Sequence, residues 1–401
     1  MMLPEIEVGL TEEELAIRDT VHKFAAEVMR PVGERLDRLP DPADVIAEGS
    51  ELWAVFEQYR ALGIGLDAMD DSDLDPLRRA RIRALINEEM GWGDGGLAIS
   101  LSVAEFHRVF ARLSGNPELI ERFCKTNSTE IGCWAITEPS HGSDMLKNDP
   151  KDFQPPARKP DCIAERDGDD FIINGQKSAW VSNGTIADVG VLFCSLMEGD
   201  ELKGGCVGVV PFDLPGVSKG KPLDKLGQRA LNQGEIFFDN VRVPASYLFI
   251  GPEMYVPIVE IVLSGANGTM GTIWAGCARA ALEHAIDYSK ERIQGGIPIG
   301  QHPHMQARLF KMLTKVEAAR SLVRRVSYFN GLGEGQMHYA IASKVFATQT
   351  AFEVASEALQ IFGGNGLTRE YPMEKLLRDA RSAMIEDGCN ELLCTLGGSK
   401  L

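Results

Sequence analysis

Two adjacent carboxylates near the end of the chain are candidates for proton chemistry. The segment MIEDGCNELL, residues 384–393, places Glu386 and Asp387 directly before Gly388, among mostly apolar neighbours. A carboxylate can take a proton from a substrate when it lies within hydrogen-bond reach of that proton. The plainer alternative is that Asp387 caps a turn or forms an ion pair before the glycine. These residues alone leave both interpretations open.

Three further segments contain groups that bind ligands or turn the chain. ITEPSHGSD, residues 136–144, offers hydroxyl and backbone N–H donors to an anionic or heteroaromatic ligand, although the same residue types are common in surface loops. NGQKSAWVSNG, residues 174–184, places Trp180 in an expected strand, where an indole packs in a core or stacks on a ligand. QIFGGNG, residues 360–366, follows an amphipathic helix and is typical of a helix cap and turn. Each segment by itself is weak evidence for a site.

The elements that must position these residues follow from hydrophobic periodicity. Residues 1–130 are predicted to be a helical domain, whose first helix starts after Thr11 as N-cap of a capping box. Residues 131–246 contain short β-branched and aromatic segments separated by Gly, Asn, Asp and Pro, which predict an antiparallel β domain. Helical periodicity then returns, and residues 247–401 are predicted to form a helical bundle. We therefore expect a mainly α, α+β fold.

Charge and composition disfavour several classes of protein. The net charge of −17, without a basic cluster, disfavours binding to nucleic acid or to anionic membrane surfaces. The eight cysteines include no C-x-x-C pair, so no zinc or dithiol motif is predicted, and scattered thiols fit a reducing compartment. The acidic start of the chain is the reverse of a targeting signal, and no apolar run is expected to span a membrane. We expect a cytoplasmic protein without a metal site.

Taken together and in order, the segments are more specific than any one of them. ITEPSHGSD, GQKSAWVSNG, ERIQGGIPIGQ at residues 291–301 and QIFGGNGLTREYPMEKLLRDAR at residues 360–381 resemble the FAD-dependent acyl-CoA dehydrogenase family over nearly the whole chain. The resemblance implies the family's fold, in which the middle domain is a β-barrel and the C-terminal domain a four-helix bundle. It also implies a homo-oligomer, usually a tetramer, and an electron-transfer flavoprotein or similar acceptor as partner.

The resemblance also implies where the ligands are bound. The flavin ring is expected against the sheet, whereas the FAD pyrophosphate and adenosine are expected at a subunit interface, with the glycine turn and Arg292 supplied by a neighbouring protomer. The implied cofactor-binding residues are Trp134, Ile136, Thr137, Ser143, Trp180, Ser182, Arg292, Gln360, Gly363, Gly364, Cys389 and Glu391. The implied substrate-binding residues are Ser143, Asp94, Asn267 and Gly388, although Asn267 stands where the family often has arginine.

In this family a carboxylate removes the α proton of an acyl-CoA thioester while hydride leaves the β carbon for flavin N5. Counting from RDAR places Asp387 at the position of that base and Glu386 where the family has an aromatic residue. An aspartate is one methylene shorter than the usual glutamate, about 1.5 Å of reach, so the substrate must come closer or differ in shape. Glu386 is the alternative base, or a neighbour that raises the proton affinity of Asp387. The position on an earlier helix that some members use is Ala266 here, which cannot act as a base.

Asp94, in GWGDGGLAIS, has two interpretations. It is either a helix N-cap before Gly95 and Leu97, or a second carboxylate that faces the acyl group, as in dehydrogenases of alicyclic carboxyl-CoA thioesters. We expect dehydrogenation of a short, branched or cyclic acyl-CoA to the enoyl-CoA, with Asp387 as base. The alternatives are a cyclohexenecarboxyl-CoA-type dehydrogenase that uses Asp94, a non-oxidative acyl-CoA lyase on the same scaffold, and a flavin-containing DNA-binding member, which the negative charge disfavours.

Overall fold

The computed structural model describes residues 3–65, 73–125, 128–146, 159–333 and 335–401. The N-terminal part is a layer of helices, and its first helix begins as predicted, because Thr11 accepts a hydrogen bond from the amide of Glu14 and the Glu14 carboxylate accepts one from the amide of Thr11. The helices of this layer are α1 (Glu12–Phe24), which continues through a π-helical turn (Ala25–Met29) into α2 (Arg30–Asp37), then α3 (Pro42–Val45), α4 (Glu51–Leu62), α6 (Pro76–Gly93), α7 (Gly95–Ala104), α8 (Phe106–Leu113) and α9 (Pro117–Phe123).

Within the described residues, the middle part of the chain forms one seven-stranded sheet. Its strands are β1 (Gly132–Ala135), β2 (Ile163–Asp167), β3 (Asp170–Ser182), β4 (Val189–Glu198), β5 (Glu201–Pro211), β6 (Val217–Lys219) and β7 (Gln233–Pro244). The order is β1-β4-β2-β3-β7-β6, with β5 also paired to β4. The prediction of an antiparallel sheet is wrong for two pairs, because β4 runs parallel to both β1 and β2. Neither pair joins consecutive strands, since β2 and β3 lie between β1 and β4 in the chain and β3 lies between β2 and β4, and parallel strands need such a long connection.

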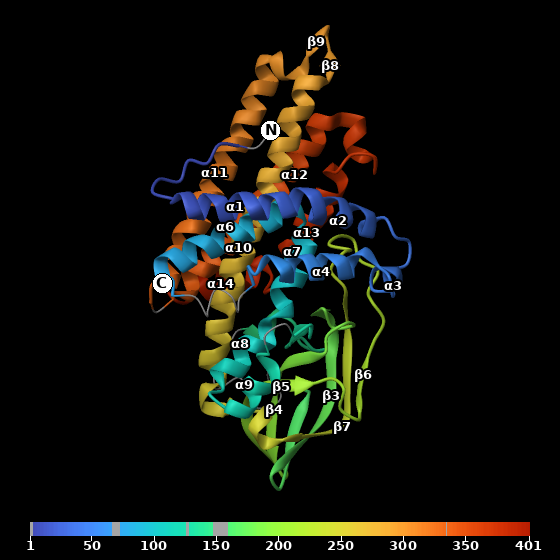
Figure 1. The fold of residues 1–401 in the computed structure, drawn as a ribbon, viewed down its shortest axis with the longest axis vertical. Coiled ribbons are helices and arrows are strands. Elements are labelled where there is room, and N and C mark those ends of the chain that lie inside the picture. Colours follow the sequence, from blue (N-terminus) through green and yellow to red (C-terminus); the bar gives the residue numbers. More distant parts are fainter. Residues whose placement is uncertain (1–2, 66–72, 126–127, 147–158, 334) are drawn as a thin grey trace.

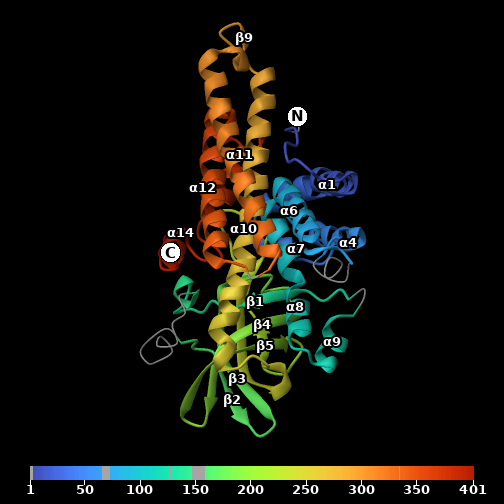
Figure 2. The ribbon, with the colours of Figure 1, turned by 90° about the vertical axis from the view of Figure 1, so that its left-hand side faces the viewer.

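Long helices make up the rest of the molecule. They are α10 (Pro252–Glu291), α11 (Pro303–Gly331) and α12 (Met337–Phe362), followed by α13 (Met373–Ala383) and α14 (Asn390–Gly398). The loop predicted at residues 331–336 lies between α11 and α12. Figure 2 shows α10, α11 and α12 side by side along the long axis, with the sheet at one end and the small hairpin of β8 (Ile293–Gln294) and β9 (Ile297–Pro298) at the other. Of the N-terminal helices, α1 and α6 lie on one flank of these long helices, whereas α8 and α9 lie beside the sheet (Figures 1 and 2).

Helices α6 and α10 touch backbone to backbone at two glycines. A Cβ atom added at Gly91 would lie 1.9 Å from the carbonyl oxygen of Ile273, and one added at Gly276 would lie 1.9 Å from the carbonyl oxygen of Glu88. Only glycine fits at such distances. This contact fixes the N-terminal layer against the long helices, and therefore fixes one wall of the space between them.

A buried ion-pair network joins the same helices. Glu88 of α6 binds Arg279 of α10 at 2.8 Å and binds Arg320 and Arg324 of α11 at 2.9 and 2.8 Å. Burial alone would raise the pKa of Glu88, but the three arginines lower it to about 2. Each charge is compensated, which is the condition under which buried ions are tolerated. The network fixes how α6, α10 and α11 lie relative to one another.

Helix α10 corrects one prediction. Its length and composition alone would allow it to cross a membrane, whereas the sequence predicts no apolar run long enough to do so. Half of its most apolar window is buried inside the molecule. There it packs against α6, α11 and α12, and Leu263, Met270 and Ile273 belong to the hydrophobic cores. Its apolar character is accounted for by this central position.

Candidate active site

A large cavity lies between the helical layer, α10, the sheet and the segment that precedes α14. Its volume is about 1850 Å³. Pockets that hold one small molecule reach about 1,000 Å³, so this one has room for a cofactor ring and a substrate together. Among the residues singled out from the sequence, those that line it are Trp134, Ile136, Thr137, Ser143, Trp180, Ser182, Ala266, Glu386, Asp387 and Gly388. The structure thus brings together residues that lie up to 254 positions apart in the chain, from Trp134 to Gly388.

The sheet side of the cavity presents aromatic rings and polar groups. Trp180 lies in β3, where the pairing with β7 shifts register between Lys177 and Val181, and it is 59% exposed in spite of its size. Trp134 of β1 has a buried Nε1 that lacks a hydrogen-bond partner among the described residues. An uncovered indole and an unused donor fit a flat heteroaromatic ligand with acceptor atoms, such as the flavin of FAD.

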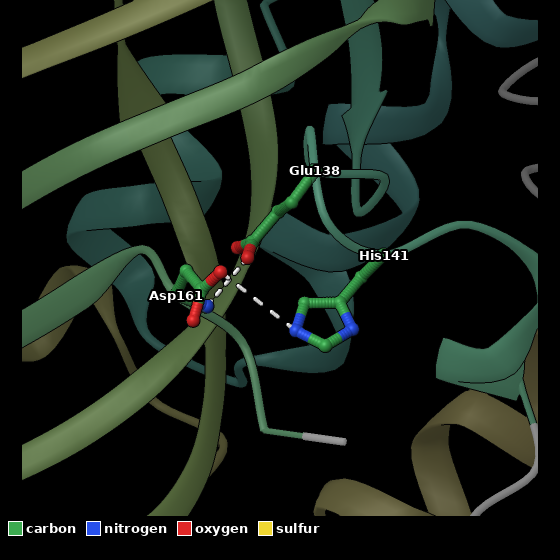
Figure 3. Close-up of side chains that lie close together, drawn as sticks. All are labelled: Glu138, His141 and Asp161. Atoms are coloured by element: carbon green, nitrogen blue, oxygen red, sulfur yellow. Dashed lines mark hydrogen bonds and ion pairs between the residues drawn. The ribbon is translucent and has the colours of Figure 1, made fainter. Parts of the chain in front are cut away.

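A cluster built around the buried Glu138 holds the loop that follows β1 and carries Ser143. Figure 3 shows Glu138, His141 and Asp161 turned toward one another, and their ligand atoms lie within 4.8 Å, a spacing that a metal ion can bridge. However, Glu138 already accepts hydrogen bonds from the Lys177 ammonium, from the Asp161 amide and from the next amide along the chain, at 2.5, 2.5 and 3.1 Å. We therefore assign this cluster to anchoring the loop.

The two acids differ in backbone and in partners. Asp387 has φ of +50°, in the left-handed region that non-glycine residues rarely occupy. Glu386 accepts a 2.6 Å hydrogen bond from Nε2 of Gln228, which also lines the cavity. Backbone strain of this kind costs about 1–3 kcal/mol and persists where the surroundings enforce it, often at functional sites.

Electrostatics also separate the two acids. Burial, together with the charge of Asp387, raises the pKa of Glu386 to about 7, although Gln228, Lys344 and Lys225 act to lower it. Burial raises the pKa of Asp387 as well, and Lys344 opposes that effect. Two carboxyl groups in one cavity with raised pKa values are typical of proton-transfer sites, although structural clusters also show such shifts.

Asp94 is not among the residues that line the cavity, which disfavours the hypothesis of a second carboxylate at the acyl group. Its plainer interpretation is confirmed, because one Asp94 oxygen accepts a hydrogen bond from the amide of Leu97 at 2.8 Å and caps α7. The other oxygen pairs with the buried ammonium of Lys375 at 2.6 Å. That partner lies 281 residues further along the chain, and its attraction turns the carboxylate into the core.

Asn267, for which the resemblance implies a substrate contact, also lies behind the cavity wall. The side chain is fully buried and is absent from the cavity wall. Its Nδ2 donates to the carbonyl of Leu263 at 3.0 Å and to the carbonyl of Asp387 at 3.3 Å. Asn267 therefore supports the backbone of the acidic segment from below.

The remaining predicted cofactor residues lie away from the cavity wall. Cys389 contributes its backbone, because its amide donates to Ser143 Oγ at 3.0 Å. Figure 1 places the hairpin that follows Arg292 at the end of the molecule opposite to the sheet. The residues exposed at the surface of the single chain are Arg292, Gln360, Gly363, Gly364 and Glu391. One chain alone does not bring them to the flavin-facing residues.

Two residues of the site were missed in the sequence. Gln228 lies in the loop before β7 with φ of +51°, and nothing local distinguishes it from other loop residues. Lys344 lies in α12, has no exposed surface, and reaches the acidic segment. A lysine on the apolar face of a predicted helix was the signal available for it, because lysine is almost never fully buried unless it has partners.

Comparisons with known proteins agree with this geometry. Two family models match, acyl-CoA dehydrogenase middle domain over residues 133–241 and acyl-CoA dehydrogenase C-terminal domain over residues 262–401. A benzylmalonyl-CoA dehydrogenase of Aromatoleum aromaticum is 30% identical over 97% of each chain, and a probable acyl-CoA dehydrogenase of Bacillus subtilis is 28% identical over 96% of each. The butyryl-CoA dehydrogenase structure of Megasphaera elsdenii has a TM-score of 0.84 at 26% identity, over 98% of this chain and 99% of that one. The chain therefore belongs to the acyl-CoA dehydrogenase family, whose members are flavoproteins that use FAD to dehydrogenate acyl-CoA thioesters.

Proposed function

We propose that this acyl-CoA dehydrogenase oxidises a short, branched or cyclic acyl-CoA to the enoyl-CoA, with Asp387 as the base that removes the α proton. The observation that carries the proposal is that Asp387 lines the same cavity as Trp180 and Ser182, the residues expected beside the flavin. When bound, FAD supplies the two-electron oxidation at flavin N5. The chain's own residues must bind the thioester, make its α proton acidic and accept that proton.

Asp387 suits the role of base better than Glu386. One oxygen of Glu386 accepts a hydrogen bond from Gln228, and with a pKa of about 7 Glu386 is largely protonated below neutral pH. A base must be ionised and free to approach the proton. The side chain of Asp387 has no hydrogen-bond donor among the described residues, and the positive charge of Lys344 favours its ionised form.

The backbone of Asp387 offers a further function. Among the residues that the structure describes, its amide N–H makes no backbone hydrogen bond. The carbonyls of Asp387 and Gly388, in contrast, accept hydrogen bonds from the side chains of Asn267 and Lys344. The α proton of a thioester becomes acidic when the thioester oxygen is stabilised as negative charge develops. A well-placed N–H donor contributes on the order of 10²–10³ in rate. We assign this role to the amide of Asp387, so that one residue both polarises the thioester and removes its proton.

The substrate class follows from the short base and the cavity wall. Ile99 and Val103 of α7, Phe106 of α8 and Met270 of α10 give the cavity apolar and aromatic surface. Such a wall suits a compact branched or ring-containing acyl group, brought close enough for an aspartate to reach it. The substrate in the name of one relative, benzylmalonyl-CoA dehydrogenase, contains a ring, which supports a ring-containing acyl group as substrate. With Asp94 in the core, the described acids at the cavity besides Asp387 are Glu386 and Asp224, of which Asp224 is paired with Arg229.

We also propose that the enzyme works as a homo-oligomer, expected to be a tetramer, and passes its electrons to an electron-transfer flavoprotein. Arg292 and the glycines after α12 are exposed and do not line the cavity of their own chain. Their sequence suits phosphate binding, because a guanidinium matches phosphate and glycine permits close backbone approach. This supports an FAD site completed by a neighbouring protomer. Light scattering of the FAD-loaded protein measures the oligomeric state directly.

The proposal is tested by anaerobic titration of the FAD-loaded protein with a panel of acyl-CoA thioesters while the flavin absorbance is followed. Short, branched and cyclic thioesters are expected to bleach the flavin. Asp387→Asn is expected to retain FAD and lose bleaching by at least about 10³-fold, since general-base catalysis alone contributes about 10²–10⁴. Glu386→Gln is expected to retain most of it. Near-normal bleaching in Asp387→Asn overturns the assignment of the base, and thioester conversion without bleaching indicates lyase chemistry instead.

A further inference from the structure

Lys344 is a fully buried lysine directly beneath the acidic segment. It lies on α12, and its ammonium donates to the carbonyl of Gly388 at 2.8 Å and to the side-chain oxygen of Asn390 at 2.9 Å. Burying an ammonium is costly unless it is hydrogen-bonded and faces negative charge. Both conditions are met here, because the ammonium is hydrogen-bonded and the two acids act on its charge, which connects the lysine to the acidic segment.

The backbone around Asp387 is held at consecutive residues. The carbonyl of Asp387 accepts from Asn267, and the carbonyl of Gly388 accepts from Lys344. The amide of Cys389 donates to Ser143 Oγ at 3.0 Å, and the amide of Asn390 donates to a carbonyl of the preceding turn at 3.0 Å. A non-glycine residue in the left-handed region requires such external support. Of these contacts, the one from Lys344 is the only one that also brings a charge.

Several charged groups face this segment from the elements packed around it. Lys344 approaches from α12 and Lys225, which also lines the cavity, from the loop before β7. The negative or ionisable groups that act on Lys344 are Asp387, Glu386, Cys389 and Glu391. Burial lowers the pKa of Lys344 to about 8, although these groups favour its charged form. Lys344 is thus protonated at neutral pH and is the cation that acts directly on Asp387.

We propose that Lys344 is a positioning residue for proton abstraction, which holds Asp387 in its left-handed conformation through the Gly388 carbonyl and keeps its carboxylate ionised through its charge. The inference rests on the proposed function, because it concerns the same base. It adds a residue that touches neither substrate nor flavin. Because Lys344 acts in two ways, two kinds of substitution separate them.

Removing the charge and removing the contact have different expected results. Lys344→Gln keeps a donor for the Gly388 carbonyl but loses the charge, so the Asp387 carboxylate binds its proton more tightly. The acid limb, which is the part of the pH profile where the bleaching rate falls as Asp387 becomes protonated, is then expected to move to higher pH by about one unit. The reason is that an opposite charge nearby lowers the pKa of a carboxyl group by about 1–3 units. Lys344→Arg keeps the charge and is expected to leave the limb in place, with a lower plateau rate. Lys344→Met loses both, and is expected to show the shift and a plateau lower by about 10²-fold, the effect of misplacing a catalytic group by about 1 Å.

The experiment measures stopped-flow flavin bleaching against pH with the thioester found most reactive for the native protein. FAD content and the melting temperature show which variants are folded. Thr348→Val is the matched control, since Thr348 is buried one turn along α12 and bonds Asn390 at 3.1 Å without carrying charge. It is expected to lower the melting temperature without moving the acid limb.

The outcomes separate this inference from the proposed function. If Asp387→Asn loses bleaching but Lys344→Gln keeps the native acid limb, the role of Lys344 is refuted while the base assignment stands. If Thr348→Val shifts the limb as much as Lys344→Gln does, the effect comes from packing and the inference is also refuted. A native profile in Lys344→Gln is informative even if Lys344→Met does not fold.

Discussion

Replacing Glu386 by glutamine removes a carboxylate whose ionised form is destabilised by burial. In the folded protein, burial and the neighbouring Asp387 raise the pKa of Glu386 from 4.5 to about 7. Each tenfold change in proton affinity is worth about 1.4 kcal/mol, so the cost of ionising Glu386 in the fold is about 3 kcal/mol. This is an upper limit, because the side chain is partly exposed to the cavity and solvent screens it.

The sign of the pH dependence follows from linkage. Below pH 4.5 Glu386 is protonated in both the folded and the unfolded protein and the cost is absent. Between pH 4.5 and about 7 the unfolded chain loses the proton first, so the free energy of unfolding falls, and above pH 7 the full cost is present. Glu386→Gln cannot ionise and is expected to remain more stable than the native protein above pH 7, with little difference at pH 4.5.

The expected change in melting temperature can be worked out from the size of the chain. An unfolding entropy of about 2.1 cal/mol/K per residue gives about 0.8 kcal/mol/K for 401 residues, so 3 kcal/mol corresponds to about 4 °C. Thermal unfolding of FAD-loaded protein is measured between pH 4.5 and 8.5, with the exposed Glu165→Gln of β2 as control. Native protein and Glu386→Gln with parallel curves over this range would refute a buried, hard-to-ionise Glu386.

Two more predictions concern residues that differ in their distance from the chemistry. Asp94→Asn leaves Lys375 paired with Asp379 alone. It is expected to destabilise the fold by about 3–5 kcal/mol in thermal unfolding and to retain flavin bleaching. Loss of bleaching in folded Asp94→Asn protein would instead indicate a catalytic Asp94. Trp180→Ala removes the exposed ring on the sheet side of the cavity. It is expected to weaken FAD binding by about tenfold in a fluorescence titration, because a stacked aromatic ring contributes about 0.5–1.5 kcal/mol. An unchanged affinity for FAD would place the flavin elsewhere.

The sequence predicted elements whose signals are local. The capping box at Thr11 marked the true start of α1, because both of its hydrogen bonds join residues three apart. Strand composition located the sheet but not the direction of its strands, since β-branched residues suit parallel and antiparallel pairs alike. Likewise, the loop between α11 and α12 was visible in its glycines, whereas the contact of α6 with α10 at Gly91 depends on two segments far apart in the chain.

The same distinction explains which site residues were found. Trp134, Trp180 and Asp387 lie in segments that resemble the family, and all three line the cavity. Asp94 was the opposite case, because its residue type and neighbours allowed two orientations. The deciding partner, Lys375, comes from a helix at the other end of the chain, and no local pattern reveals such a pairing.

Asp94 nevertheless reaches the active site through a chain of buried polar contacts. Lys375 lies 2.6 Å from both Asp94 and Asp379, Asp379 accepts a hydrogen bond from the amide of Gln228, and Gln228 donates to Glu386 at 2.6 Å. The two adjacent acids are therefore held by different supports: Glu386 is fixed from the core through Gln228, whereas Asp387 is supported by Lys344 and Asn267 at its backbone. Adjacent side chains so anchored cannot exchange roles without breaking buried hydrogen bonds. This is the physical reason to assign the proton to Asp387, whose charge is favoured by Lys344, and not to Glu386.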